Sequence, residues 1–169
     1  KSYTRAQPCD RWEGERLTAL RHEVSVHNAI PKEFLRCDVF YSEPAWRAGM
    51  KTFNTRAGSR CDFRDYLRGV QKFIELGKPT VLTASKNHMK ALGAPAFSCE
   101  TTIVSSHNCR AQLMFYNFDY DGPTRNSVQV IYNLAQRFDC VGDFSCGFCN
   151  TGRIFLRNGK RAVLSDYDA

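Results

Sequence analysis

Apolar side chains recur at the spacing of an α-helix over residues 63–74. Asp62 precedes this stretch as a suitable N-cap, while Gly77 and Pro79 would end the helix. A short apolar run at residues 80–84 follows directly and is typical of a buried strand. The positions that would form the buried face of the helix are Phe63, Tyr66, Leu67, Val70, Phe73 and Ile74.

Strand patterns occur on both sides of this helix. Residues 38–41 have the pattern of a strand that ends in a turn at residues 42–44, and residues 23–26 have that of a shorter strand. A strand, a helix and a strand in this order predict two parallel strands joined by a right-handed crossover. Residues 97–104 and 111–118 are both rich in β-forming residues and predict an antiparallel pair at one edge of the sheet.

Helix and strand patterns continue to alternate after this pair. They predict a helix at residues 127–138 capped by Ser127, a strand at 139–144, a helix at 153–157 and a strand at 162–164. No repeat or linker divides the chain, so residues 1–169 are expected to form one domain. The predicted fold class is α/β, a mostly parallel sheet with an antiparallel edge strand.

Composition agrees with a packed core, because 43% of the residues are apolar and 12% are aromatic. No apolar run approaches the roughly 18 residues that span a bilayer, and the first residues are charged. A soluble, cytoplasmic protein with no membrane partner is therefore expected. Only Cys146 and Cys149 among eight cysteines have a metal-ligand spacing, and no second close pair completes a site. We expect reduced thiols and no bound metal.

A formal net charge of +7 favours an anionic partner such as nucleic acid. The alternative is a basic protein that binds no polyanion. Two stretches concentrate the cations without any acid, one before residue 61 and one at residues 153–161. The candidate nucleic-acid contacts in the first stretch are Arg47, Lys51, Arg56 and Arg60.

A turn containing small residues at positions 141–152 joins a predicted strand to a predicted helix. Glycine has no Cβ, so a ligand can approach the backbone of such a turn closely. The next predicted strand ends at Asp166. An acid at that place can accept hydrogen bonds from both ribose hydroxyls of an adenosyl group.

Residues 139–168 resemble the S-adenosylmethionine-binding region of amino-directed DNA methyltransferases, in which Asp-Pro-Phe-x-Gly-x-Gly precedes a helix and an acidic strand end. The usual proline is absent, and Cys149 stands where glycine or serine is commoner. The resemblance implies a Rossmann-like methyltransferase fold with helices on both faces of the sheet and S-adenosylmethionine as cofactor. An ordinary α/β turn without a ligand is the alternative. The implied cofactor-binding residues are Asp143, Phe144, Ser145, Gly147 and Asp166.

The sequence Glu43-Pro44-Ala45-Trp46 is similar to the reacting tetrapeptide of the same family, Asp/Asn/Ser-Pro-Pro-Tyr/Phe/Trp. The resemblance implies that Glu43 accepts a hydrogen bond from the amine, that the Pro44 carbonyl helps to orient the amine, and that Trp46 stacks on a flipped base. Glutamate is one methylene longer than aspartate, and alanine replaces the second proline. These departures bear on catalysis more than on binding.

The order of the pieces resembles a permuted group of these enzymes, in which the reacting tetrapeptide precedes the cofactor turn. Within this likeness, Asn28 corresponds to a strand end that contacts the adenine. A recognition segment would fall at residues 119–126, where only a short link is present. Specificity would then come from the basic stretch, from a second subunit in a homodimer or other complex, or from substrate shape.

These observations lead to the hypothesis of an S-adenosylmethionine-dependent N-methyltransferase. Its substrate would be an exocyclic amine of nucleic acid, adenine N6 in DNA in preference to RNA. The first alternative is a catalytically degenerate module that binds cofactor or nucleic acid. The second is an enzyme that degrades S-adenosylmethionine without methylating an acceptor.

Overall fold

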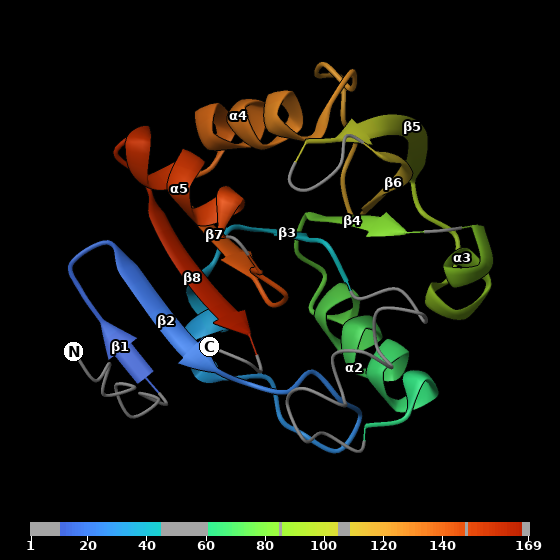
Figure 1. Ribbon diagram of the computed structural model, residues 1–169, viewed down its shortest axis with the longest axis horizontal. Helices are drawn as coiled ribbons and strands as arrows, with labels where there is room; N and C mark the ends of the chain where they lie inside the picture. The colour runs from blue at the N-terminus through green and yellow to red at the C-terminus, as the bar shows by residue number, and fades with distance from the viewer. Residues whose placement is uncertain (1–10, 45–60, 85, 105–108, 148, 167–169) are drawn as a thin grey trace, which may run out of the picture.

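The computed structural model describes residues 11–44, 61–84, 86–104, 109–147 and 149–166 (Figure 1). One sheet contains the strands β1 (Arg11–Glu13), β2 (Leu17–Arg21), β3 (Val39–Ser42), β4 (Thr80–Ala84), β5 (Phe97–Ile103), β6 (Cys109–Tyr116), β7 (Cys140–Asp143) and β8 (Arg161–Asp166). The helices are η1 (Lys32–Arg36), a 3-10 helix, and α2 (Phe63–Glu75), α3 (Lys86–Leu92), α4 (Ser127–Arg137) and α5 (Asn150–Arg157). None of the helices in the described ranges is long and apolar enough to cross a membrane.

The strand order is β1-β2-β8-β7-β3-β4-β6-β5. Neighbours from β2 to β4 pair in parallel, and the outer pairings of β1 with β2, β4 with β6 and β6 with β5 are antiparallel. The predictions of a parallel β3–α2–β4 unit and of an antiparallel pair at one edge are therefore confirmed. The antiparallel strand β1 at the opposite edge was not predicted from the sequence.

The prediction of a strand at residues 23–26 is wrong. This segment leaves the sheet after β2 and packs on α2, where the Val26 N–H donates to the Asp65 carbonyl at 2.9 Å. Gly69 of α2 makes this contact possible, because a Cβ there would lie 2.6 Å from the backbone nitrogen of Ser25. The apolar character of Val24 therefore reflects burial against a helix and not a place in the sheet.

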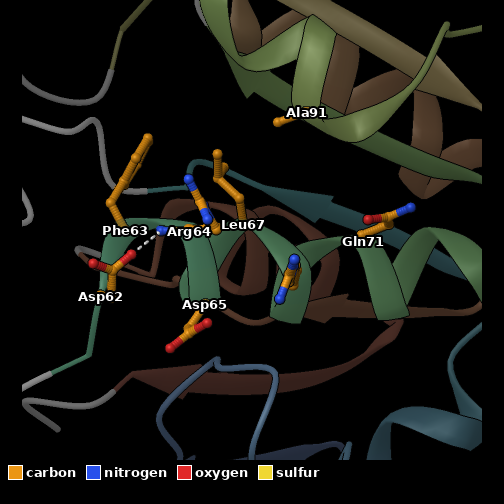
Figure 2. Close-up of a pocket in the computed structure, with 8 residues that line it drawn as sticks. Asp62, Phe63, Arg64, Asp65, Leu67, Gln71 and Ala91 are labelled. Carbon is orange, nitrogen blue, oxygen red and sulfur yellow. Dashed lines mark hydrogen bonds between the residues drawn. The ribbon is translucent and has the colours of Figure 1, made fainter.

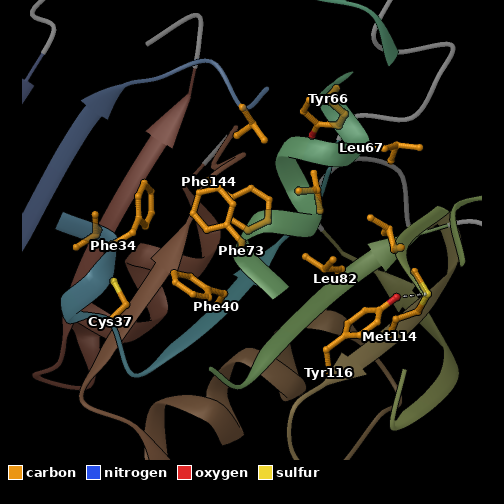
Figure 3. Close-up of a cluster of buried hydrophobic side chains, with 14 of the residues drawn as sticks. Phe34, Cys37, Phe40, Tyr66, Leu67, Phe73, Leu82, Met114, Tyr116 and Phe144 are labelled. Atoms are coloured by element: carbon orange, nitrogen blue, oxygen red, sulfur yellow. Dashed lines mark hydrogen bonds between the residues drawn. The ribbon is translucent and has the colours of Figure 1, made fainter. Parts of the chain in front are cut away.

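Helices cover both faces of the sheet, as predicted (Figure 1). On the α2 face, aromatic rings fill the core, with Phe73 stacked on Phe144 at 4.1 Å between ring centres and set edge-on to Phe40 (Figure 3). On the other face, α4 and α5 pack on side chains that include Tyr41 and Phe155. The two faces alternate along β3, so Phe40 and Tyr41 belong to different cores.

The predicted helices begin close to where expected. Asp62 caps α2, since its side chain accepts a hydrogen bond from the Arg64 N–H at 2.6 Å. The cap of α4 is Asn126 and not Ser127, because the Asn126 side chain accepts from the Gln129 N–H at 2.9 Å.

Two further differences concern Ser127 and the residues after β4. The Ser127 hydroxyl accepts a hydrogen bond from the Val104 N–H at 3.1 Å, which ties the end of β5 to the start of α4. Residues 86 and 87, expected in a loop, begin α3.

Candidate functional site

The predicted cofactor and reacting residues meet at the carboxyl ends of three adjacent parallel strands. β8, β7 and β3 are neighbours in the sheet, and they end at Asp166, Asp143 and Ser42. Glu43 and Pro44 follow Ser42 directly. Ligands of open α/β sheets bind at this edge. The fold therefore brings together residues that lie more than a hundred positions apart in the sequence.

Asp143 is buried at the end of β7, with 3% of its surface exposed. Its Oδ1 accepts hydrogen bonds from the Ser42 hydroxyl at 2.9 Å and the Ser145 N–H at 3.2 Å. Burial raises the pKa of Asp143 to about 7, although hydrogen bonds from Thr151, Ser145 and Ser42 oppose the rise. The carboxyl group thus ties β3, the turn and α5 together, and it changes charge near neutral pH.

Asp166 faces the turn that follows β7. Its Oδ2 accepts a hydrogen bond from the Gly147 N–H at 2.9 Å, and the Cys146 N–H donates to the Ser165 carbonyl at 3.0 Å. Gly147 and Cys149 both have left-handed backbones, with φ of 44° and 58°. Glycine adopts this conformation without strain, whereas cysteine does so rarely. The contact between acid and glycine turn that the sequence predicted is present.

Phe144 and Ser145 lie in this turn in different ways. Phe144 is 2% exposed and stacked on Phe73, so its side chain belongs to the core (Figure 3). Any contact of Phe144 with a ligand would have to come from its backbone. The Ser145 hydroxyl lies 3.2 Å from the Tyr66 hydroxyl of α2. Tyr66 was predicted only as a core residue, and its hydroxyl brings α2 to the turn.

Glu43 projects on the α4–α5 side of the sheet. Its Oε1 accepts a hydrogen bond from the buried Tyr41 hydroxyl at 3.4 Å. Burial raises the pKa of Tyr41 well above its usual value, and the Glu43 and Asp143 carboxylates add to the rise. Tyr41 therefore remains a hydrogen-bond donor to Glu43. The sequence pattern predicted Tyr41 only as a strand residue, and its place two positions before Glu43 is the signal that was missed.

A pocket of about 280 Å³ opens beside Glu43 between the first turns of α4 and α5. Arg153 and Arg157 of α5 contribute positive charge to it. Its other lining residues are Val104, Ser127, Val128, Ile131, Asn150 and Ile154. The predicted acceptor thus faces a small cavity with apolar walls and two cations, which suits a ligand with an apolar part and a negative charge.

Of the remaining reacting residues, Pro44 is buried next to Glu43. Trp46 lies outside the described residues. Asn28, predicted to contact adenine, lies in a turn after β2, where its side-chain amide donates to the Glu23 carbonyl at 2.9 Å. Its role in adenine binding stays a prediction.

The two basic stretches have different outcomes. Arg47, Lys51, Arg56 and Arg60 lie outside the described residues. The second stretch is divided between opposite edges of the sheet, because only Arg153 and Arg157 lie beside Glu43. Lys160 pairs with Asp139 at 2.6 Å, and Arg161 begins β8 at the amino edge. The prediction of one continuous phosphate-binding face over residues 153–161 is therefore wrong.

A wider groove of about 920 Å³ runs along α2 toward Ala91 of α3 (Figure 2). Its walls carry both signs of charge, with Asp62 and Asp65 beside Arg64 and Arg68. Such a mixed surface is not the one-sign patch that a polyanion requires. Within the described part of the chain, no cluster of three His, Cys, Asp or Glu side chains could hold a metal ion.

No protein-family model matches the sequence, and no curated protein matches it. Solved structures do match. The crystal structure of M1.HpyAVI has a TM-score of 0.54 at 10% identity, covering 89% of this chain and 91% of that one. The M1.HpyAVI complex with S-adenosylmethionine has a TM-score of 0.50 at 9% identity, covering 80% and 83%.

A DNA modification methylase of Thermus thermophilus, TTHA0409, complexed with S-adenosyl-L-methionine, covers 76% of this chain and 79% of its own at 12% identity. Its TM-score of 0.45 is too low for an inference of its own. At identities this low, a structural likeness establishes the fold and not the activity. The chain has the Rossmann-like fold of methyltransferases, as the sequence predicted.

Proposed function

We propose that this protein is an S-adenosylmethionine-dependent N-methyltransferase that acts on an exocyclic amine of nucleic acid, adenine N6 in DNA. The observation that carries the proposal is the arrangement at the carboxyl edge. The Asp166 carboxylate accepts from the Gly147 N–H at 2.9 Å, and Glu43 ends the strand next to β7. The match to M1.HpyAVI, which has been crystallised with S-adenosylmethionine, supports the same choice of cofactor.

In this proposal the chain supplies two subsites. Asp166 accepts the ribose hydroxyls, and the backbone of residues 144–147 lies along the cofactor, with Asp143 holding the turn to β3. Bound S-adenosylmethionine would supply an electrophilic methyl group on its sulfonium. Glu43 accepts a hydrogen bond from the amine and offsets the positive charge that develops on nitrogen. Because the sulfonium is a strong donor, no general base with a tuned pKa is required.

The experiment that tests the proposal is methyl transfer from radiolabelled S-adenosylmethionine to duplex DNA, single-stranded DNA and RNA. Label in DNA that is recovered as N6-methyladenine after digestion supports the full proposal. Label recovered as a different methylated amine would keep the methyltransferase and overturn the adenine assignment. No label in any acceptor, with S-adenosylmethionine bound, would overturn the enzyme.

A second function, a degenerate binding module, is favoured by the surroundings of Glu43. Its carboxylate is longer than the family's aspartate and accepts from Tyr41, which holds it toward the α4–α5 pocket. A displacement near 1 Å at a reacting group can cost about a hundredfold in rate. Breakdown of S-adenosylmethionine in the absence of any acceptor would instead support an enzyme that consumes the cofactor.

A further inference from the structure

Two cysteines stand in the turn between β7 and α5, and their sulfur atoms are in contact. Cys146 Sγ and Cys149 Sγ lie 3.4 Å apart, and both residues are half-buried. The Cys149 N–H also donates to the Cys146 carbonyl at 2.6 Å, so the backbone already brings the pair together. We propose that Cys146 and Cys149 form a thiol–disulfide modification site whose oxidation by a small-molecule disulfide, such as oxidised glutathione, weakens the binding of S-adenosylmethionine.

A second pair of cysteines shows what distinguishes this site. Cys37 and Cys140 also lie close, with 3.9 Å between their sulfur atoms. They are 1% and 2% exposed, beneath the aromatic core of the α2 face. A dissolved disulfide cannot reach them without unfolding, because exchange needs direct attack on the incoming sulfur. Proximity is shared by the two pairs, and access belongs to Cys146 and Cys149.

The order of the steps follows from the surroundings of the two thiols. Burial, with the nearby Asp143 carboxylate, raises the pKa of the Cys146 thiol, which therefore keeps its proton. Cys149, at the start of α5, is the attacking group. Its thiolate attacks one sulfur of oxidised glutathione, the glutathione S–S bond breaks, and one glutathione thiolate leaves.

The second step closes the ring within the protein. The Cys146 thiol gives its proton to the departed glutathione thiolate and attacks the Cys149 sulfur of the mixed disulfide. The second glutathione then leaves as a thiolate and takes a proton from water. Two protein thiols are oxidised by two electrons in all, and one oxidised glutathione becomes two reduced glutathiones.

The expected effect on the cofactor rests on the proposed function, because it requires this turn to hold S-adenosylmethionine. A disulfide brings its sulfur atoms to about 2.05 Å and fixes the segment between them. Gly147 lies in that segment, with its N–H directed at Asp166. A fixed turn holds the Asp166 carboxylate against Gly147, so the acid cannot shift to accept both ribose hydroxyls.

Peptide mapping of the full chain tests the modification. The protein is incubated with oxidised glutathione, its remaining thiols are alkylated under denaturing conditions, and it is cleaved with trypsin. Cleavage after Arg137 and Arg153 leaves Cys140, Cys146 and Cys149 in one peptide, while Cys37 lies in another. We expect a disulfide within the first peptide and an alkylated Cys140. Alkylated Cys146 and Cys149, or a crosslink between the two peptides, would overturn the site.

Calorimetry with S-adenosylmethionine tests the consequence. Oxidised protein should bind at least about fivefold more weakly than reduced protein, within the range of ordinary coupling between sites, and dithiothreitol should restore the affinity. Cys149→Ser should abolish the response to oxidised glutathione, whereas Cys109→Ser, at an exposed position, should keep it. Equal affinities would overturn the effect on the cofactor. If reduced protein fails to bind, the proposed function fails and the effect with it, while the peptide map still decides the modification.

Discussion

The turn after β7 and the end of β3 lie side by side on one edge of the sheet, but different contacts hold them. In the turn, Asp143 and Asp166 each accept a backbone N–H from a residue a few positions away along the turn or across it. The end of β3 is held by side chains, since the Ser42 hydroxyl bonds to Asp143 and the Tyr41 hydroxyl bonds to Glu43.

This difference separates binding from chemistry. A ligand that meets a backbone turn depends little on the side chains of the turn, so the absence of the family's proline and the presence of Cys149 need not prevent binding. A reacting amine depends on the exact reach of Glu43 and on Tyr41, which aims it. We therefore expect cofactor binding to be retained under conditions that abolish methyl transfer, and the following experiments test that expectation.

The largest expected effect is on the cofactor side, at Asp166. Asp166→Ala removes the acceptor for the ribose hydroxyls and should weaken S-adenosylmethionine binding by about 2 kcal/mol, or about thirtyfold. Asp139→Ala is the matched control, because Asp139 is exposed at the opposite edge and pairs with Lys160. Calorimetry on both variants decides the matter. Unchanged affinity in a folded Asp166→Ala protein would remove this acid from the site.

The reacting side is tested at Glu43. Glu43→Gln keeps an acceptor but loses the charge that favours the developing cationic amine, so the methylation rate should fall at least about tenfold while cofactor affinity stays the same. Glu100→Gln, on an exposed position of β5, is the control. The rate is measured as label transferred to DNA under single-turnover conditions.

Glu43→Asp restores the commoner family residue and divides the two proposed functions. An active aspartate variant beside an inactive wild type would identify the wild-type protein as a binding module. If Glu43→Gln and wild type methylate at equal rates, Glu43 is not the acceptor.

A third experiment uses the buried charge of Asp143. Its pKa in the folded chain is about 7, above the ordinary value of 3.8, so the folded state holds a proton that the unfolded state releases. The free energy of unfolding should therefore fall as pH rises from about 4 to about 7, by at most about 1.4 kcal/mol per pH unit, and level off above. Urea denaturation across this interval measures the slope.

Asp143→Asn should lose this contribution, since asparagine does not titrate. Burial lowers the pKa values of His22 and His88, which gives slopes of the opposite sign, but both histidines are present in the two proteins. The difference in unfolding free energy between variant and wild type thus isolates Asp143. A difference that stays constant with pH would show that Asp143 is charged throughout.

The sequence predicted the central part of the fold because its signals are local. The apolar spacing of α2, its Asp62 cap and the following strand need no distant partner to be recognised. The segment at residues 23–26 failed for the opposite reason, since burial against Gly69 of α2 gives the same apolar pattern as a place in a sheet. β2 was missed because its exposed and buried positions include threonine, alanine and arginine, which weaken the strand pattern.

The site was predictable to the extent that it follows strand ends. Asp143, Asp166 and Glu43 each close a strand, and parallel strands bring such residues to one edge. The bonds from Tyr41 to Glu43 and from Tyr66 to Ser145 could not be predicted, because they depend on which side of the sheet each side chain faces. The same applies to the separation of Arg153 and Arg157 from Arg161.

The smallest expected effect concerns that separation and tests whether the α4–α5 pocket meets phosphates. Each phosphate contact on duplex DNA contributes about 0.9 to the slope of log affinity against log salt concentration. If Arg153 and Arg157 make such contacts, the double variant Arg153→Gln/Arg157→Gln should lower the slope by up to about 1.8 by the same rule. Arg161→Gln, at the amino edge, should leave it unchanged. Fluorescence anisotropy with labelled DNA at several salt concentrations measures all three. A steep wild-type slope that the double variant keeps would assign the phosphate contacts to other cations, whereas a flat wild-type slope would favour a small-molecule substrate over nucleic acid.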